Sequence, residues 1–113
     1  MTDSIVVLTT CATEADAERI ARALLDSHLV ACVSVAPQVR SFYRWKGEVE
    51  SSAECLLLMK TTRERFGALG AALERLHPYE LPEILALPVV AGSANYLNWL
   101  AESLRPGHGG TGE

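Results

Sequence analysis

Three short apolar runs constrain the fold of this chain more than any other feature. They occupy residues 5–8, 56–59 and 84–87, and none of them alternates apolar with polar side chains. A strand of an antiparallel sheet that is covered on one face normally does alternate, because successive side chains point to opposite faces. Each run therefore predicts a strand that is buried on both faces.

Amphipathic helices are predicted between these runs. Thr13 and Asp16 have the spacing of a capping box, and apolar residues then recur at i, i+3 and i+4. Thr61 and Glu64 have the same spacing before a second apolar stripe, so we expect Thr61 or its neighbour to begin the second helix. That helix should end at His77, because a residue that precedes proline avoids the helical region.

The segment between residues 32 and 60 predicts a long β-hairpin. Its outgoing strand should run from about Cys32 to Trp45, with a bulge near Pro37. Lys46 and Gly47 supply a tight turn, and an apolar strand returns from it. The hairpin is long for a small domain, so its tip should project beyond the sheet.

The fourth strand should cover residues 83–90 and lie at a sheet edge near Pro88, because proline cannot donate to a ladder. The predicted order is strand, helix, strand, strand, helix, strand and a short terminal helix after residue 93. This is the α+β, ferredoxin-like βαββαβ sandwich with an added C-terminal helix. A chain of 113 residues fits one domain, which we place at residues 1–105, with 106–113 as a disordered tail that has nothing to bury.

One short helix is too small to cover the second face of such a sheet. An apolar face left open would aggregate, so we predict that it is buried against copies of the same chain. The long hairpin would then reach across to a neighbouring subunit.

Charge and composition exclude several classes of partner. A formal net charge of -4 gives no general attraction to nucleic acid. No apolar run approaches the roughly 18 residues that a membrane span needs, and the N-terminus lacks the basic segment of a signal peptide. Three cysteines without C-x-x-C spacing are typical of reduced thiols, and we predict a cytoplasmic protein.

The first candidate site is the stretch 77–83, where His77, Tyr79, Glu80 and Glu83 lie close together. Two prolines fix the backbone around them. One interpretation is a polar pocket that binds a cation or a charged small molecule. The other is a rigid turn whose polar groups satisfy backbone donors or a neighbouring subunit, and the sequence leaves both open.

The second candidate site is the hairpin tip, where aromatic and charged groups combine. Its residues are Tyr43, Arg44, Trp45, Lys46, Glu48 and Glu50. This combination suits a protein interface as well as a ligand site. Lys60 ends an apolar strand, where its ammonium group could extend to solvent or enter a cleft.

Catalytic and metal motifs are absent from the sequence. His28, His77 and His108 share no ligand spacing, so a metal site would need His77 with cysteines or carboxylates brought together by the fold. No phosphate loop, nucleophile elbow or metallohydrolase pattern is present, and we expect no enzymatic activity. Acid–base chemistry by Glu80 and His77 is the alternative.

The sequence resembles the CutA family of small divalent-cation tolerance proteins from about residue 5 to residue 104. The motifs that carry the resemblance are LVACV at 29–33, SFYRWKG at 41–47, LMKT at 58–61, HPYE with PE at 77–83, and YL with WL at 96–100. The resemblance implies a ferredoxin-like homotrimer similar in architecture to the PII signalling proteins, located in the cytoplasm. It also implies a role in the response to copper and other divalent metal ions, without enzymatic activity.

The resemblance also indicates metal-ligand candidates. Copper-linked members of the family can carry a cysteine near the end of the first strand and a second histidine before the H-P-Y motif. Those positions are Thr9 and Leu76 here, although Cys11 lies close to the first and Cys32 matches a family cysteine. His77 is retained in place. The candidates are therefore His77, Cys11 and Cys32, with copper or another divalent cation as the ion.

Two further functions are compatible with the sequence. One is a PII-like sensor whose clefts bind a small anionic or nucleotide ligand, with Lys60 and Arg44 as counter-charges. The other is a trimeric scaffold that binds a partner protein and no metal.

Overall fold

The chain folds into a four-stranded antiparallel sheet packed with helices, as the computed structural model describes it for residues 1–107. The strand order is β2-β3-β1-β4, which confirms the predicted ferredoxin-like arrangement. The elements in chain order are β1 (Ser4–Cys11), α1 (Glu14–Asp26), β2 (Cys32–Trp45), β3 (Glu48–Thr62), the 3-10 turn η1 (Arg63–Arg65), α2 (Phe66–Leu76), β4 (Leu85–Pro88) and α3 (Ala94–Ser103). Most of the predicted tail, residues 108–113, lies outside the described residues.

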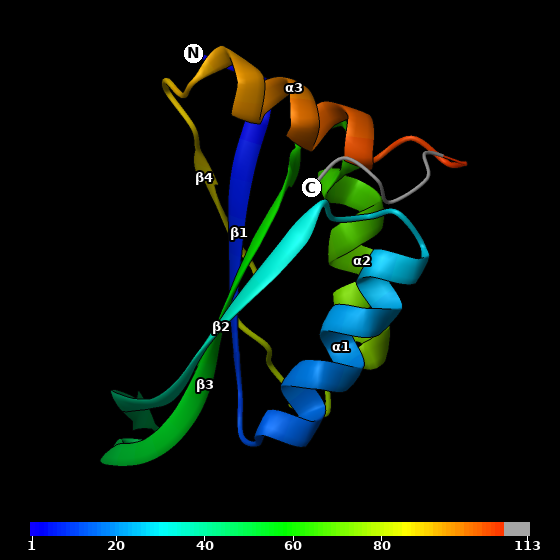
Figure 1. Ribbon diagram of the computed structural model, residues 1–113. Helices are drawn as coiled ribbons and strands as arrows, with labels where there is room; N and C mark the ends of the chain where they lie inside the picture. The colour runs from blue at the N-terminus through cyan, green and yellow to red at the C-terminus, as the bar shows by residue number, and fades with distance from the viewer. Residues whose placement is uncertain (108–113) are drawn as a thin grey trace.

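Helices α1 and α2 cover one face of the sheet, and α3 lies across its end (Figure 1). The core lies between the first two helices and the central strands. In that core Val7 of β1 is opposite Met59 of β3, and both are fully buried. The largest buried helix side chains that meet them are Ile20, Leu24, Leu69 and Leu73.

The two predicted helix starts have different outcomes. Thr13 caps α1 as expected, since its side-chain oxygen accepts a hydrogen bond from the Asp16 amide at 3.0 Å. The expectation that Thr61 or its neighbour begins the second helix is right for the neighbour, because Thr62 is the N-cap residue of η1, which leads directly into α2. It is wrong for Thr61. Thr61 is buried in β3 and its hydroxyl donates to the Leu29 carbonyl at 2.8 Å, so the strand continues and α2 begins only at Phe66.

The hairpin has the predicted turn and bulge. Lys46 and Gly47 have φ angles of 51° and 82°, as a tight type I′ turn requires at both central positions. The pairing of β2 with β3 shifts register between Ala36 and Val39, at the predicted bulge. The tip of the hairpin extends well beyond the helical layer (Figure 1).

The fourth strand is shorter than predicted and lies at the sheet edge. It covers Leu85–Pro88 rather than residues 83–90, and Pro88 pairs with Ile5 at its end. Proline cannot donate a ladder hydrogen bond, which accounts for the early end of the strand. Its edge position confirms the interpretation of Pro88.

The second face of the sheet is only partly covered within one chain. Leu85 and Leu87 lie opposite Leu8 and Val6 on this face, and they are 56% and 50% exposed. Helix α3 covers the other end, where Leu100 is buried. The predicted burial of these strands on both faces is therefore not complete in a single chain.

Candidate functional site

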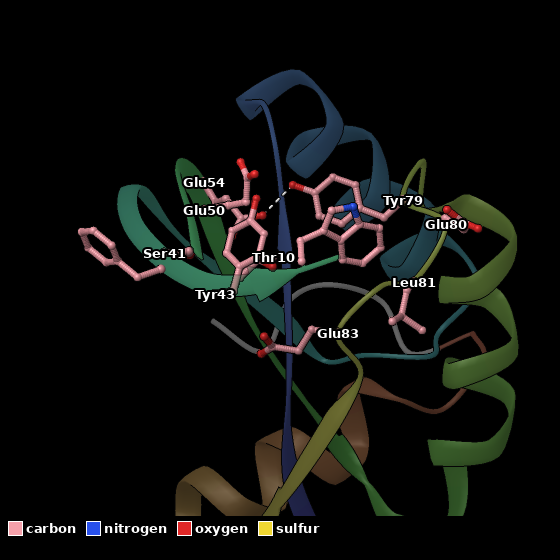
Figure 2. A pocket seen from close by; sticks show the side chains of 11 residues that line it. Thr10, Ser41, Tyr43, Glu50, Glu54, Tyr79, Glu80, Leu81 and Glu83 are labelled. Atoms are coloured by element: carbon pink, nitrogen blue, oxygen red, sulfur yellow. Dashed lines mark hydrogen bonds between the residues drawn. The ribbon is translucent and has the colours of Figure 1, made fainter. Parts of the chain in front are cut away.

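A cavity of about 590 Å³ lies between the hairpin and the segment that follows α2 (Figure 2). Five predicted residues line it. Tyr43 and Trp45 come from β2, while Tyr79, Glu80 and Glu83 come from the segment between α2 and β4. The fold therefore joins the two candidate clusters, which are separate in the sequence, into one site.

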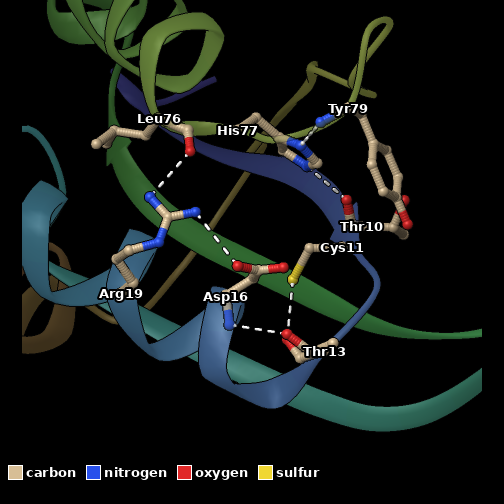
Figure 3. A network of polar contacts seen from close by, with 8 residues as sticks. All are labelled: Thr10, Cys11, Thr13, Asp16, Arg19, Leu76, His77 and Tyr79. Atoms are coloured by element: carbon tan, nitrogen blue, oxygen red, sulfur yellow. Dashed lines mark hydrogen bonds and ion pairs between the residues drawn. The ribbon is translucent and has the colours of Figure 1, made fainter.

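His77 holds the segment after α2 against the end of β1 (Figure 3). Its ring Nε2 lies 2.7 Å from the Thr10 carbonyl, and its Nδ1 lies 3.1 Å from the Tyr79 backbone nitrogen. Because a carbonyl only accepts, Nε2 is the protonated nitrogen, and Nδ1 accepts from the Tyr79 amide. Both ring nitrogens are thus engaged by backbone groups, and the side chain is only 6% exposed.

Tyr79 connects this segment to the hairpin. Its ring packs on the His77 ring with the centroids 4.6 Å apart, and its hydroxyl donates to Glu54 Oε2 at 2.5 Å. Burial, followed by the hydrogen bond and the charge of Glu54, raises the pKa of Tyr79. The phenol therefore stays protonated at neutral pH and can act only as a neutral partner for the carboxylate.

Sequence reasoning missed several of the residues that line the cavity. The further lining residues are Thr10, Ser41, Phe42, Glu50, Glu54 and Leu81. Glu50 was noted only as part of the hairpin tip, and Glu54 was not identified. The signal was present, because residues 50, 52 and 54 are polar and alternate residues of a strand share a face.

Arg44 and Lys60 do not join the site. Arg44 is paired with Val49 and follows Tyr43 in the strand, so it points to the opposite face of the hairpin. Lys60 is paired with Val6 and Cys32 near α3. Among the residues that the structure describes, no lysine, arginine or histidine side chain lines the cavity. Its charge is therefore unsuited to the anionic ligand for which these two residues were considered as counter-charges.

The three metal candidates do not come together either. Cys11 is fully buried, and its thiol donates to the Thr13 carbonyl at 3.5 Å. Burial, with a smaller effect of Cys55, raises the pKa of Cys11 from 9.0 to about 11, whereas a metal ligand must be a thiolate. Cys32 lies elsewhere, with its sulfur 3.8 Å from the Tyr96 hydroxyl.

Within residues 1–107, no group of three or more His, Cys, Asp or Glu side chains is placed to hold a metal ion. With both nitrogens of His77 engaged by the backbone, the donor set of one chain does not fit a divalent-metal site.

The chain is similar to known proteins over most of its length. Residues 5–103 match the family model described as CutA1 divalent ion tolerance protein. The chain belongs to the CutA1 family. A divalent-cation tolerance protein CutA from Thermus thermophilus is 48% identical over 98 residues, which cover 87% of this chain and 95% of that relative.

Solved CutA structures agree with the fold. CutA from Xylella fastidiosa superposes with a TM-score of 0.89 at 38% identity, covering 92% of this chain and all of that one. A protein from Archaeoglobus fulgidus described as the periplasmic divalent cation tolerance protein CutA gives 0.87 at 32% identity, covering 90% of this chain and 99% of that one. None of the helices in residues 1–107 is long and apolar enough to cross a membrane.

Proposed function

We propose that this chain acts in divalent-cation tolerance as a homotrimer in the cytoplasm. Family membership supports the cellular role, and the open second face of the sheet supports the assembly. Leu85 and Leu87 leave half of their surface exposed on β4, and the hairpin at the other edge of the sheet extends past its own domain. A face of this kind is stabilised when a second copy covers it.

Light scattering during size-exclusion chromatography tests the assembly. The wild type should elute with about three times the 12.2 kDa mass of one chain. Leu85→Glu with Leu87→Glu should reduce the mass to that of one chain, because two carboxylates would be buried without partners. Leu25→Glu, on the outer part of α1, is the matched control and should leave the mass unchanged. A wild type that elutes as a monomer overturns the trimer.

The second part of the proposal is that the chain responds to divalent cations, with copper as the first ion to test, and has no catalytic activity. Growth of a bacterial strain that lacks its own CutA protein, with and without this chain in added Cu²⁺, measures the cellular role. Titration calorimetry of Cu²⁺ into wild type and His77→Ala measures binding. Equal, negligible heats in both would remove metal binding while leaving the assembly intact.

A second candidate function is favoured by the cavity itself. A hollow of about 590 Å³ falls in the size range of small-molecule sites. This observation supports a PII-like small-molecule sensor better than a scaffold that binds no ligand. The acidic lining restricts the chemistry of that ligand.

A further inference from the structure

Two of the free cysteines lie directly opposite each other in the sheet. Cys11 is the last residue of β1, and Cys55 is its partner in the antiparallel ladder with β3. Both side chains are buried and belong to the core beneath α1 and α2. Cys32 lies on another strand, β2, where it is paired with Lys60. The fold thus brings together two thiols that are far apart in the sequence.

The register of the ladder fixes how far apart the two backbones lie. Just before β1, the Arg63 amide donates to the Asp3 carbonyl at 2.9 Å, in the same register as the rest of the ladder. Hydrogen-bonded pairs recur at every second residue of an antiparallel ladder, so Cys11 and Cys55 form such a pair. The Cα atoms of such a pair lie about 5.5 Å apart, within the range of about 4.4 to 6.8 Å in which disulfides form.

The same geometry makes a disulfide at this position a strained one. Directly opposite Cβ atoms lie about 4.5 to 5.5 Å apart, with hydrogen-bonded pairs at the wide end of that range. An ordinary disulfide brings its Cβ atoms to about 3.5 to 4.5 Å. Strained disulfides are reduced more easily than relaxed ones and are labile rather than structural. The position therefore suits a bond that forms under oxidation and is reversed by thiols.

We propose that Cys11 and Cys55 are a reversible redox pair, with hydrogen peroxide as the oxidant. Cys55, which is 3% exposed against 0% for Cys11, reacts first. Its sulfur takes one oxygen atom from the peroxide and becomes a sulfenic acid, and one water is released. The Cys11 sulfur then attacks the Cys55 sulfur, so that an S–S bond forms and the S–O bond breaks. The departing hydroxide takes the Cys11 proton as a second water, and two electrons have passed from the thiols to the peroxide.

The place of this pair at the end of a strand gives it access to oxidant and a connection to the cavity. Strand ends open more readily than strand centres, and β1 ends at Cys11. Thr10 and Glu54 directly precede the two cysteines and line the cavity, and the Thr10 carbonyl accepts from His77. A bond that draws the two cysteines together therefore shifts this wall of the cavity.

The inference goes beyond the proposed function, since it concerns one chain and depends on neither the trimer nor a metal ion. It also fits the proposed location, because disulfides in a reducing compartment are transient and act in redox sensing.

Peptide mapping of the folded full chain after exposure to hydrogen peroxide tests the pair. The remaining thiols are blocked with iodoacetamide in urea, and trypsin then places the three cysteines in three different peptides. We expect the linked peptides of Cys11 and Cys55 in at least tenfold excess over either linkage to Cys32. Reduced glutathione, added before blocking, should remove them. Cys32→Ser is the matched control and should change their yield less than twofold, whereas Cys55→Ala should abolish them.

Four outcomes overturn the inference. They are complete blocking of Cys11 and Cys55 by iodoacetamide after exposure, similar yields of all three linkages, oxidation of Cys55 to a sulfinic acid without linked peptides, and a linkage that reduced glutathione does not remove. Exposure in urea, where the ladder is absent, should remove most of the excess. An excess that persists there would show that the fold does not select the pair.

Discussion

At the scale of single residues, Thr9 and Thr61 are fully buried hydroxyl groups on the neighbouring strands β1 and β3. The Thr61 hydroxyl donates to the Leu29 carbonyl, whereas the Thr9 hydroxyl has no partner among the described residues. A buried hydroxyl without a partner loses its hydration and gains nothing in return. The two threonines therefore contribute to stability with opposite sign.

Replacing each threonine by valine separates these contributions. Thr9→Val should raise the free energy of unfolding by about 1 kcal/mol, because only an unsatisfied group is removed. Thr61→Val should lower it by about 1 to 3 kcal/mol, because the Leu29 carbonyl loses its donor. Urea unfolding of both variants measures the difference. If both substitutions changed the free energy of unfolding in the same direction, the opposite contributions of the two hydroxyl groups would be contradicted.

The buried thiol of Cys11 should make the fold less stable in alkaline solution. Its pKa is raised from 9.0 to about 11 by burial, so the folded chain holds this proton more tightly than the unfolded chain does. The stabilisation is complete below pH 9 and is lost as the pH rises through 11. We expect the free energy of unfolding to fall by about 2 to 3 kcal/mol across that window.

Denaturant unfolding at a series of pH values measures this loss. Cys11→Ala should flatten the part of the profile that begins at pH 9. The phenol of Tyr79, whose pKa is also raised, adds a loss of the same sign at higher pH, so the comparison is made in a Tyr79→Phe background. An unchanged profile after Cys11→Ala would refute the assignment.

His77 shows why sequence spacing alone suggests a metal ligand but cannot test it. Sequence spacing shows that an imidazole follows a helix, but it does not show what lies opposite the ring. The Thr10 carbonyl and the Tyr79 amide occupy both nitrogens. The alternative interpretation, a rigid turn whose polar groups satisfy the backbone, describes His77 within one chain.

At the scale of elements, Arg65 joins the ends of two helices. Its Nε donates to the His28 carbonyl after α1 at 3.1 Å, and its Nη2 donates to the Leu104 carbonyl after α3 at 2.9 Å. Both carbonyls lie just past the ends of their helices, where no further turn of helix supplies a donor. A guanidinium with several fixed donors is suited to satisfy two of them at once.

Arg65→Lys should therefore destabilise the fold although the charge is kept. A single ammonium cannot reach both carbonyls with the same geometry, and we expect a loss of about 1 to 2 kcal/mol in urea unfolding. Arg75→Lys, at an exposed position in the last turn of α2, is the control and should change the free energy of unfolding by less than about 0.5 kcal/mol. Equal effects would show that Arg65 acts through its charge alone.

Elements were predicted well where local chemistry decides them. Thr13, the Lys46–Gly47 turn and the Pro78 boundary each depend on a few neighbouring residues, and all are found as expected. Thr61 was misassigned because a carbonyl distant in sequence competes for its hydroxyl. The contact between Glu54 and Tyr79 could not be predicted for the same kind of reason, since only the fold brings Tyr79 to Glu54.

At the scale of the whole molecule, the fold class and the family follow from the order of elements and the motifs, and both are confirmed. The cavity could not be located from the sequence, because its walls come from segments that meet only in the tertiary structure. The assembly stays a proposal that depends on the open face around Leu85 and Leu87.

That proposal predicts how thermal stability depends on concentration. If subunits cover each other's open face, the melting temperature should rise as the chain is concentrated, because association stabilises the folded state by mass action. Scanning calorimetry over a hundredfold range of concentration measures the slope. Leu85→Glu with Leu87→Glu should remove it. A melting temperature independent of concentration in the wild type would argue against assembly.

The bulge at Pro37 decides which residues of the second half of β2 face the cavity. Before it, Ser34 and Ala36 pair with the even-numbered residues of β3; after it, the odd-numbered Tyr43 and Trp45 do. Had the pairing continued in the register of the first half, Arg44 rather than Tyr43 and Trp45 would lie on the face that carries Glu50 and Glu54. The acidic character of the hollow is thus set by one extra residue, several positions away from any side chain that lines it.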